Sequence, residues 1–356
     1  MGEETCKRGK SIQRPMQRPM RWAGMACGVS ILLSVIAGSI GCTKGTAAVS
    51  AIAIHPTNSQ IVYVGTSKHI RKSRDGGKTW TLSDKGLGSV RIISLAINPR
   101  SPAQVFAGTF GEAVYKSWDG GQDWVADNVG LKGHISIVSS IIFDPQLPET
   151  MYLGSTVGVY KWDNLKREWE ERVNGMESVY TVPLVADPSR PGVLYAGTSG
   201  GIYKSVDGAE SWKAINEGLS INPVGGALSH GVNAIVLSPT QPDTLYIGTT
   251  RGFFASQDGG AHWTQNQTIP PGGVAAVAVN PAHPMVLYAG GADIGVVKSL
   301  DGGATWRAAD NGLTNRAIRV LAIDPQTPET LYAGTNGGLF KTVDGGQIWT
   351  QEKIED

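Results

Sequence analysis

The octapeptide "SLDGGATW" at residues 299–306 has close copies elsewhere in this chain of 356 residues. The other well-preserved copies are "SRDGGKTW" at 73–80, "SWDGGQDW" at 117–124, "SVDGAESW" at 205–212, "SQDGGAHW" at 256–263 and "TVDGGQIW" at 342–349. Their aspartates are 43 or 44 residues apart, except for one interval of 88 and one of 51. The interval of 88 is two periods, and "KWDNLKREW" at 161–169 lies in its middle as a degenerate copy. The chain therefore contains seven repeats.

Two other signals recur once in every repeat. A proline follows an apolar run at Pro56, Pro99, Pro145, Pro188, Pro239, Pro281 and Pro325. A glycine follows about nine residues later, at Gly65, Gly108, Gly154, Gly197, Gly248, Gly290 and Gly334. Both signals give the same count of seven.

One repeat, residues 318–354, contains four short apolar segments separated by turns that contain glycine or proline, which predicts four antiparallel strands. The run "VLAI" at 320–323 is apolar at every position, so this first strand is expected to be covered on both faces. Packing between two neighbouring blades of a ring buries both faces. We therefore predict an all-β fold, a seven-bladed β-propeller of four-stranded antiparallel blades over residues 49–356, closed without a strand exchanged between its ends. The blades are expected to start near residues 49, 90, 135, 178, 231, 273 and 317.

The repeated octapeptide itself is predicted to be a structural turn between strands three and four. Its aspartate can accept backbone N–H groups in an Asx-type turn, and its glycines can adopt positive φ. Its tryptophan is expected to fill the wedge between blades. The aspartates assigned this structural role are Asp75, Asp119, Asp207, Asp258, Asp301 and Asp344.

Charge and cysteine content exclude several classes of function. Residues after position 42 carry 25 basic and 28 acidic side chains, which gives no basic footprint for nucleic acid. All three cysteines, Cys6, Cys27 and Cys42, precede the repeats, so disulfides and thiolate zinc sites are not expected there. The six histidines show no metal-ligand spacing. We expect no metal and no cofactor.

The N-terminal residues have the pattern of an export signal. Six basic residues precede the uncharged, apolar stretch 23–41, which ends in "GSIGC". We interpret 1–42 as a signal peptide whose lipobox makes Cys42 a lipidated first residue, with 43–48 as a linker. An ordinary cleavage site after Gly41 and an uncleaved anchor are the alternatives. All three place the repeats outside the cytoplasm, either membrane-attached as a lipoprotein or periplasmic or extracellular.

The pattern S-x-D-x-G-x-T-W resembles the Asp-box, or BNR, repeat. This repeat occurs in sialidases, xyloglucan-degrading enzymes, sortilin-type receptors and the photosystem II stability and assembly factor family. The even, seven-repeat spacing behind an exported leader is most similar to the assembly-factor group. That resemblance implies a propeller whose Asp boxes lie away from the functional face.

The same resemblance leaves two functions open. The first is a non-catalytic, monomeric propeller that binds or assembles a protein partner in the bacterial cell envelope. The second is a glycoside hydrolase, sialidase-like or glucan-degrading. The R-I-P motif typical of sialidases is absent. Glycoside hydrolysis requires two neighbouring carboxylates, and Glu112 and Asp293 are the loop candidates.

A partner-binding surface is predicted on the face opposite the Asp boxes, where first strands begin. Arg91 and the pair Arg316 and Arg319 belong to repeats two and seven, which only repeat one separates in a ring. Repeat one adds Lys68 and His69. We expect these five side chains to form a basic patch that binds acidic groups of a partner. The long connection 216–233 is the next candidate.

Overall fold

The computed structural model describes residues 47–133, 135–219 and 231–354. All regular structure in these ranges is β-strand, in seven separate four-stranded sheets. None of the described residues forms a helix that could cross a membrane. The predicted signal peptide 1–42, with Cys42, and most of the predicted linker 43–48 lie outside the described residues.

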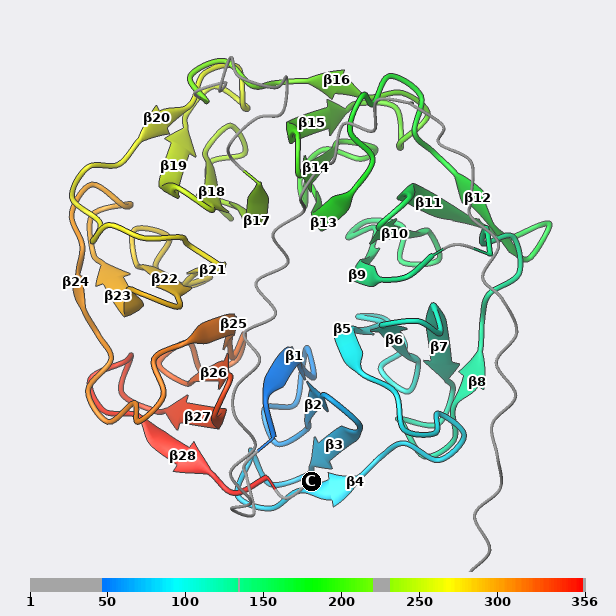
Figure 1. The fold of residues 1–356 in the computed structure, drawn as a ribbon, viewed down its shortest axis with the longest axis horizontal. Helices are drawn as coiled ribbons and strands as arrows, with labels where there is room; N and C mark the ends of the chain where they lie inside the picture. The colour runs from blue at the N-terminus through cyan, green and yellow to red at the C-terminus, as the bar shows by residue number, and fades with distance from the viewer. Residues whose placement is uncertain (1–46, 134, 220–230, 355–356) are drawn as a thin grey trace, which may run out of the picture. The chain divides into compact units, whose positions relative to one another are not determined.

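Each sheet consists of four strands that follow one another in sequence, paired antiparallel. The seven sheets surround a common axis as the blades of a propeller (Figure 1), which confirms the predicted fold and blade count. The innermost strands are β1 (Val49–Ile54), β5 (Ile92–Ile97), β9 (Val138–Phe143), β13 (Thr181–Ala186), β17 (Val232–Leu237), β21 (Ala276–Val279) and β25 (Ile318–Ile323). The outermost strands are β4 (Thr81–Leu82), β8 (Val125–Ala126), β12 (Glu168–Glu171), β16 (Lys213–Ala214), β20 (Thr264–Gln265), β24 (Arg307–Ala308) and β28 (Thr350–Glu352).

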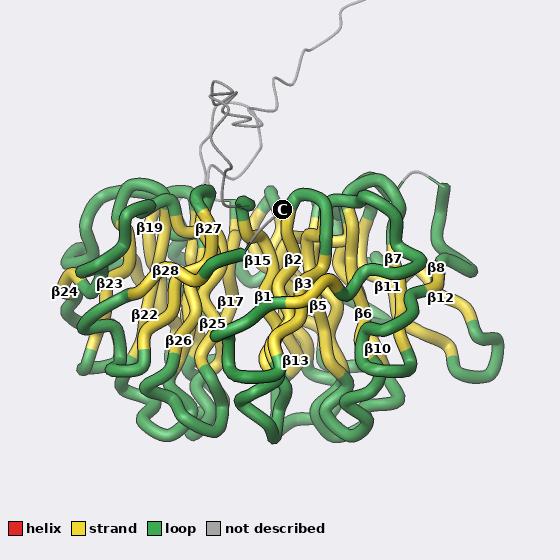
Figure 2. The backbone as a smooth tube through the Cα atoms, turned by 90° about the horizontal axis from the view of Figure 1, so that it is seen from below, coloured by secondary structure: helices red, strands yellow, loops and turns green. Residues whose placement is uncertain are grey.

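The middle strands of each blade carry most of the core. The second strands are β2 (Val62–Thr66), β6 (Val105–Thr109), β10 (Met151–Ser155), β14 (Leu194–Thr198), β18 (Leu245–Thr249), β22 (Leu287–Gly291) and β26 (Leu331–Thr335), and every residue in them is buried. The third strands are β3 (Ile70–Ser73), β7 (Val114–Ser117), β11 (Gly158–Asp163), β15 (Gly201–Ser205), β19 (Gly252–Ser256), β23 (Gly295–Ser299) and β27 (Gly338–Thr342). The strands cross the thickness of the ring, and turns occupy both of its faces (Figure 2).

The recurring glycine of the second strand has a packing role. A Cβ atom built on Gly65 would lie 2.4 Å from the Cγ2 atom of Ile92, in the inner strand of the next blade. At the last junction, a Cβ on Gly334 would lie 2.8 Å from Cγ1 of Val49. Only glycine lets neighbouring blades approach this closely near the axis, and the periodic glycine follows from that constraint.

The Asp-box turn is held by its own side chains. In blade six, Oδ1 of Asp301 accepts the backbone N–H of Thr305 at 2.9 Å and the hydroxyl of Ser299 at 2.7 Å. The Ser299 hydroxyl also accepts the backbone N–H of Gly303, whose φ is 89°. Hydrogen bonds from Thr305 and Ser299 lower the pKa of Asp301 to about 2. The carboxylate therefore stabilises the turn in its ionised form.

Tryptophans of the repeat join blade to blade. The indole N–H of Trp124 donates a 2.8 Å hydrogen bond to the carbonyl of Ser83, at the outer edge of the preceding blade. Equivalent bonds run from Trp169 to Asp127, from Trp212 to Arg172, from Trp263 to Ile215 and from Trp349 to Ala309. Trp306 instead bonds to Gly303 within its own turn. At five junctions, the indole is thus the wedge that the sequence predicts.

The junction between blades seven and one closes the ring by packing. Val49 and Ile354 belong to one buried cluster, together with Tyr332. The Tyr332 hydroxyl and the Lys341 ammonium both donate to the carbonyl of Gly76, each at 2.7 Å. No strand in the described residues pairs with a strand of another blade, as expected for closure without strand exchange.

Candidate binding surface on the face opposite the Asp boxes

The two faces of the ring carry different turns. The backbone N–H of Gly76 in an Asp box bonds to Gln60, so the boxes share a face with the turns between first and second strands. On the other face, Phe110 of the β6–β7 turn bonds through its N–H to the carbonyl of Arg91, just before β5. We call this second face the mouth face. It holds the turns between second and third strands and the connections between blades.

A β-bulge places Arg319 on the mouth face. Ile318 pairs with Thr335 and Val320 pairs with Gly334, so Arg319 is the additional residue on β25. Such bulges redirect a side chain relative to the regular alternation of a strand. The Arg319 side chain donates from Nε to Oδ1 of Asn336. Asn336 lies in the β26–β27 turn and was not predicted as a site residue.

Arg91 and Arg319 lie close enough to repel each other. Partial burial and the positive charge of Arg91 lower the pKa of Arg319. Both residues remain exposed. Within the ranges that the structure covers, neither arginine forms an ion pair with a carboxylate. The mouth face thus holds two neighbouring guanidinium groups whose repulsion an anionic ligand would relieve.

The other predicted members of the basic patch are arranged differently. Nδ1 of His69 lies 2.6 Å from Oδ2 of Asp84, and Nη2 of Arg316 lies 2.5 Å from Oδ2 of Asp310. His69 and Arg316 therefore each already have a carboxylate partner. Lys68, in the turn between β2 and β3, is exposed. Of the five predicted residues, the structure leaves Arg91, Arg319 and Lys68 without a carboxylate partner among the described residues.

The partners of His69 and Arg316 occupy equivalent positions that the sequence analysis missed. Asp84 and Asp310 each stand two residues before a glycine-leucine pair, in the connection from one blade to the next. Asn128 and Asn216 occupy the same position in other blades, and each accepts a backbone N–H from a third strand. The recurring pattern [Asp/Asn]-x-Gly-Leu could have revealed this position. The Asp or Asn side chain of this pattern lies beside the turn between the second and third strands of its blade.

The two candidate carboxylates for hydrolysis, Glu112 and Asp293, belong to different blades. Glu112 lies in the turn between β6 and β7 of blade two, and Asp293 lies between β22 and β23 of blade six. No cluster of three or more His, Cys, Asp or Glu side chains in the described part of the chain is arranged to hold a metal ion. Residues 220–230 of the long connection lie outside the described residues.

Comparison with curated proteins finds similarity to two fungal enzymes. Over 143 residues the chain is 34% identical to the "Probable oligoxyloglucan-reducing end-specific xyloglucanase" of Neosartorya fischeri, which covers 33% of this chain and 17% of that protein. Over 149 residues it is 26% identical to a xyloglucanase of Hypocrea jecorina, covering 39% of this chain and 18% of that protein. The chain thus matches less than a fifth of the length of either relative. No protein-family model matches it.

Comparison with solved structures shows the fold. The GH74 xyloglucanase from Xanthomonas campestris superposes with a TM-score of 0.70 at 17% identity, over 87% of this chain and 55% of that one. YCF48 bound to a D1 peptide superposes with a TM-score of 0.62 at 16% identity, over 84% of this chain and 94% of that one. The extracellular domain of a putative hybrid two-component system from B. thetaiotaomicron gives 0.65 at 15% identity, over 86% and 41%. A xyloglucanase, an extracellular domain of a two-component system and YCF48 thus all superpose on this chain, and the similarity shows the propeller fold alone.

Proposed function

We propose that this chain is a non-catalytic, exported propeller that binds an acidic segment of a protein partner in the cell envelope. The observation that carries the proposal is the pair Arg91 and Arg319 on the mouth face, two exposed guanidinium groups that lack a carboxylate partner in the described residues. Arginine presents several N–H donors in a planar array that matches carboxylates. Turns on a rigid ring are a common location for such binding.

One comparison supports binding of a peptide, and another supports export. YCF48 has this fold along nearly its whole length and is solved with a bound D1 peptide. The extracellular domain of a putative hybrid two-component system is also among the similar structures, which fits export of the ring. We further propose that lipid on Cys42 tethers the protein and that it acts as a monomer. Replacing Cys42 by Ser and fractionating cells tests the tether, because unchanged membrane association would reject it.

The test of the binding site is the double variant Arg91→Ala plus Arg319→Ala. We expect binding of an acidic peptide of mixed Asp and Glu to weaken at least about tenfold, which corresponds to about 1.4 kcal/mol, and to fall with rising salt in the wild type. Thermal stability should hardly change, because both side chains are exposed. The control is Arg74→Ala plus Arg307→Ala, two exposed arginines that lie away from the mouth face.

The same three proteins can be compared in a pull-down from envelope membranes, which would contain the natural partner. A pull-down with the wild type, the double variant and the control variant should recover a partner that only the double variant loses. Unfolding of the double variant would show that the arginines belong to the core. A stable double variant with full partner binding would show that docking occurs elsewhere, and the connection around Pro223 to His230 would be tested next.

Glycoside hydrolysis is the second candidate function, favoured by the 34% identity to the Neosartorya fischeri enzyme. Hydrolysis requires two carboxyl groups about 5 to 10 Å apart. Asp84 and Asp310 on the mouth face are engaged with His69 and Arg316, which leaves Glu112 and Asp293 as candidates. Release of reducing ends from xyloglucan, β-glucans or sialosides by the wild type, lost in Glu112→Gln or Asp293→Asn, would establish the enzyme instead of the binding protein.

A further inference from the structure

A pocket between blades two and three lies where the usual lysine bond to an Asp box is missing, although the tryptophan bond from Trp169 to Asp127 is present. In five other blades, the lysine of the third strand reaches the Asp box of the next blade, as Lys72 does to the carbonyl of Gly120 at 2.6 Å and Lys161 does to that of Gly208 at 3.2 Å. Corresponding bonds run from Lys204 to Gly259, from Lys298 to Gly345 and from Lys341 to Gly76. Blade three has no regular Asp box, so Lys116 of blade two has no such acceptor.

The second and third strands of blade two differ from those of other blades in a way that matches the missing box. Lys116 turns to Asp127 in its own blade, with 2.7 Å between Nζ and Oδ1. The second strand of blade two has Phe106 where all six other blades have a tyrosine in the same register, such as Tyr63, whose hydroxyl bonds to the next box. The hydroxyl is thus absent where its acceptor is absent. Because the hydroxyl and its acceptor are lost together, we interpret this region as a distinct local structure and not only as a degenerate turn.

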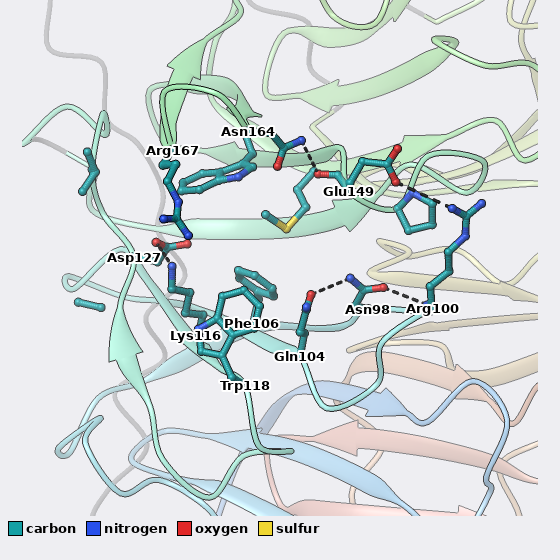
Figure 3. Close-up of a pocket in the computed structure, with 15 residues that line it drawn as sticks. Asn98, Arg100, Gln104, Phe106, Lys116, Trp118, Asp127, Glu149, Asn164 and Arg167 are labelled. Atoms are coloured by element: carbon teal, nitrogen blue, oxygen red, sulfur yellow. Dashed lines mark hydrogen bonds and ion pairs between the residues drawn. The ribbon is translucent and has the colours of Figure 1, made fainter.

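The resulting cavity has a volume of about 680 Å³, within the range of about 300 to 1,000 Å³ common for small-molecule sites. Figure 3 shows its side chains arriving from both blades. The ammonium group of Lys116 lies 5.4 Å from the ring centroid of Trp118 and 5.7 Å from that of Trp162. Trp118 is 56% exposed, so much of its indole faces solvent beside the cavity. The exposed face of the Trp118 indole is a flat apolar surface on which a ligand could stack.

Polar groups around this platform retain capacity for hydrogen bonds. Asp127 is 5% exposed, and its Oδ2 atom has no hydrogen-bond partner among the described residues. A buried acceptor without a donor costs free energy, which a hydroxyl of a ligand would recover. The amide of Asn98 bonds to Oε1 of Gln104, so the NH₂ group of Gln104 is available. Asn164 donates to the carbonyl of Glu149, so its own amide oxygen can still accept.

Arg167 adds a donor from a strained position. It has a φ of 57°, one of three non-glycine residues with positive φ in the described ranges, in the turn between β11 and β12. Its side chain is exposed, lines the cavity and forms no ion pair with a described residue. Non-glycine residues in this region cost about 1 to 2 kcal/mol, and such strain is found most often at functional sites.

We propose that this cavity, the Trp118 pocket, is a binding site for an uncharged saccharide, separate from the partner surface on the mouth face. The apolar face of a sugar ring would stack on Trp118, while its hydroxyls would donate to Asp127 and Asn164 and accept from Gln104 and Arg167. Charges of both signs line the pocket, namely those of Arg100, Lys116, Asp127, Glu149 and Arg167. This mixture favours a neutral polyhydroxylated ligand over an anion or a cation.

The probes are short cello-, xylogluco-, manno-, galacto- and chito-oligosaccharides, titrated into the purified full-length protein by calorimetry and tryptophan fluorescence. We expect at least one series to bind. Trp118→Ala should weaken that binding at least tenfold, and Arg167→Gly should weaken it several-fold while relieving the positive φ. The matched control is Leu300→Ala, because Leu300 is exposed at the same position of the blade-six box and does not line this pocket.

The outcomes separate this proposal from the proposed function. Binding that Trp118→Ala abolishes and Leu300→Ala retains, with the melting temperature unchanged, supports the saccharide site. Binding to no member of the panel would overturn it, as would binding that survives Trp118→Ala. Acidic-peptide binding lost in Trp118→Ala, without saccharide binding, would also overturn it and would move the protein-binding surface here. Arg91→Ala plus Arg319→Ala should leave saccharide affinity unchanged.

Discussion

Lys72 in blade one donates a 2.6 Å hydrogen bond to the backbone carbonyl of Gly120 in the Asp box of blade two. Burial, followed by the charge of Arg74, lowers the pKa of Lys72 to about 8. The ammonium group thus gives up part of its hydration in order to join two blades. This lysine, together with the tyrosine of the second strand, links the Asp box of one blade to the core of the preceding one.

Removal of one such link should weaken the closure of the ring. Tyr332 and Lys341 share the carbonyl of Gly76, so Tyr332→Phe deletes one of two hydrogen bonds across the junction of blades seven and one. We expect the free energy of unfolding to fall by about 1 to 2 kcal/mol, measured by urea denaturation. Tyr180→Phe, at an exposed tyrosine, should change it little. Equal effects of both substitutions would argue against the link.

The Asp boxes should make the fold sensitive to acid. Hydrogen bonds lower the pKa of Asp75, Asp207 and Asp301 to about 2, from 3.8 in the unfolded chain. Their contribution to stability is therefore complete above about pH 4 and is lost as the pH falls toward 2. Asp301→Asn should lower the melting temperature at pH 7 and reduce its decline between pH 4 and pH 2. Glu177→Gln, at an exposed residue, should leave both quantities unchanged.

The connections between blades require glycine for two separable reasons. Gly312 has a φ of 89°, and a Cβ there would lie 2.2 Å from the carbonyl oxygen of Trp349. Gly88 has a φ of 71° but open space around a Cβ. We expect Gly88→Ala to cost about 1 kcal/mol from backbone strain alone, and Gly312→Ala to cost clearly more. Denaturant titration of both variants measures the difference, and equal costs would rule out the steric argument.

His262 replaces the threonine of the box in blade five and should titrate above the ordinary range. Its Nδ1 lies 2.7 Å from Oδ2 of Asp258, and this hydrogen bond, with the charge of Glu217, raises the pKa of His262. The protonated form stabilises the turn, so the gain is complete below pH 6.5 and is lost as the pH rises through the shifted pKa. NMR titration should show this value returning toward normal in Asp258→Asn. An unchanged titration would refute the pairing.

Sequence periodicity was sufficient to predict the fold, because each signal corresponds to one physical constraint. The proline ends an inner strand, the glycine lets inner strands approach, and the tryptophan joins blades. The mouth face was predicted less completely. The order of the repeats in a ring suggested that Arg91 and Arg319 are near each other, but the pairing of His69 with Asp84 depends on side-chain directions in two turns, which periodicity does not report. The Trp118 pocket was missed because the degenerate box was interpreted only as a lost turn.

Every blade consists of four consecutive strands, so cutting the chain between two blades leaves each blade whole. Val49 and Ile354 already lie in one buried cluster, so a short peptide joining these ends would bridge neighbouring residues. A circular permutant opened in any exposed connection between blades would keep all seven sheets intact. The new chain ends, and any fusion partner attached to them, can thus be placed beside any chosen blade without altering a single strand pairing.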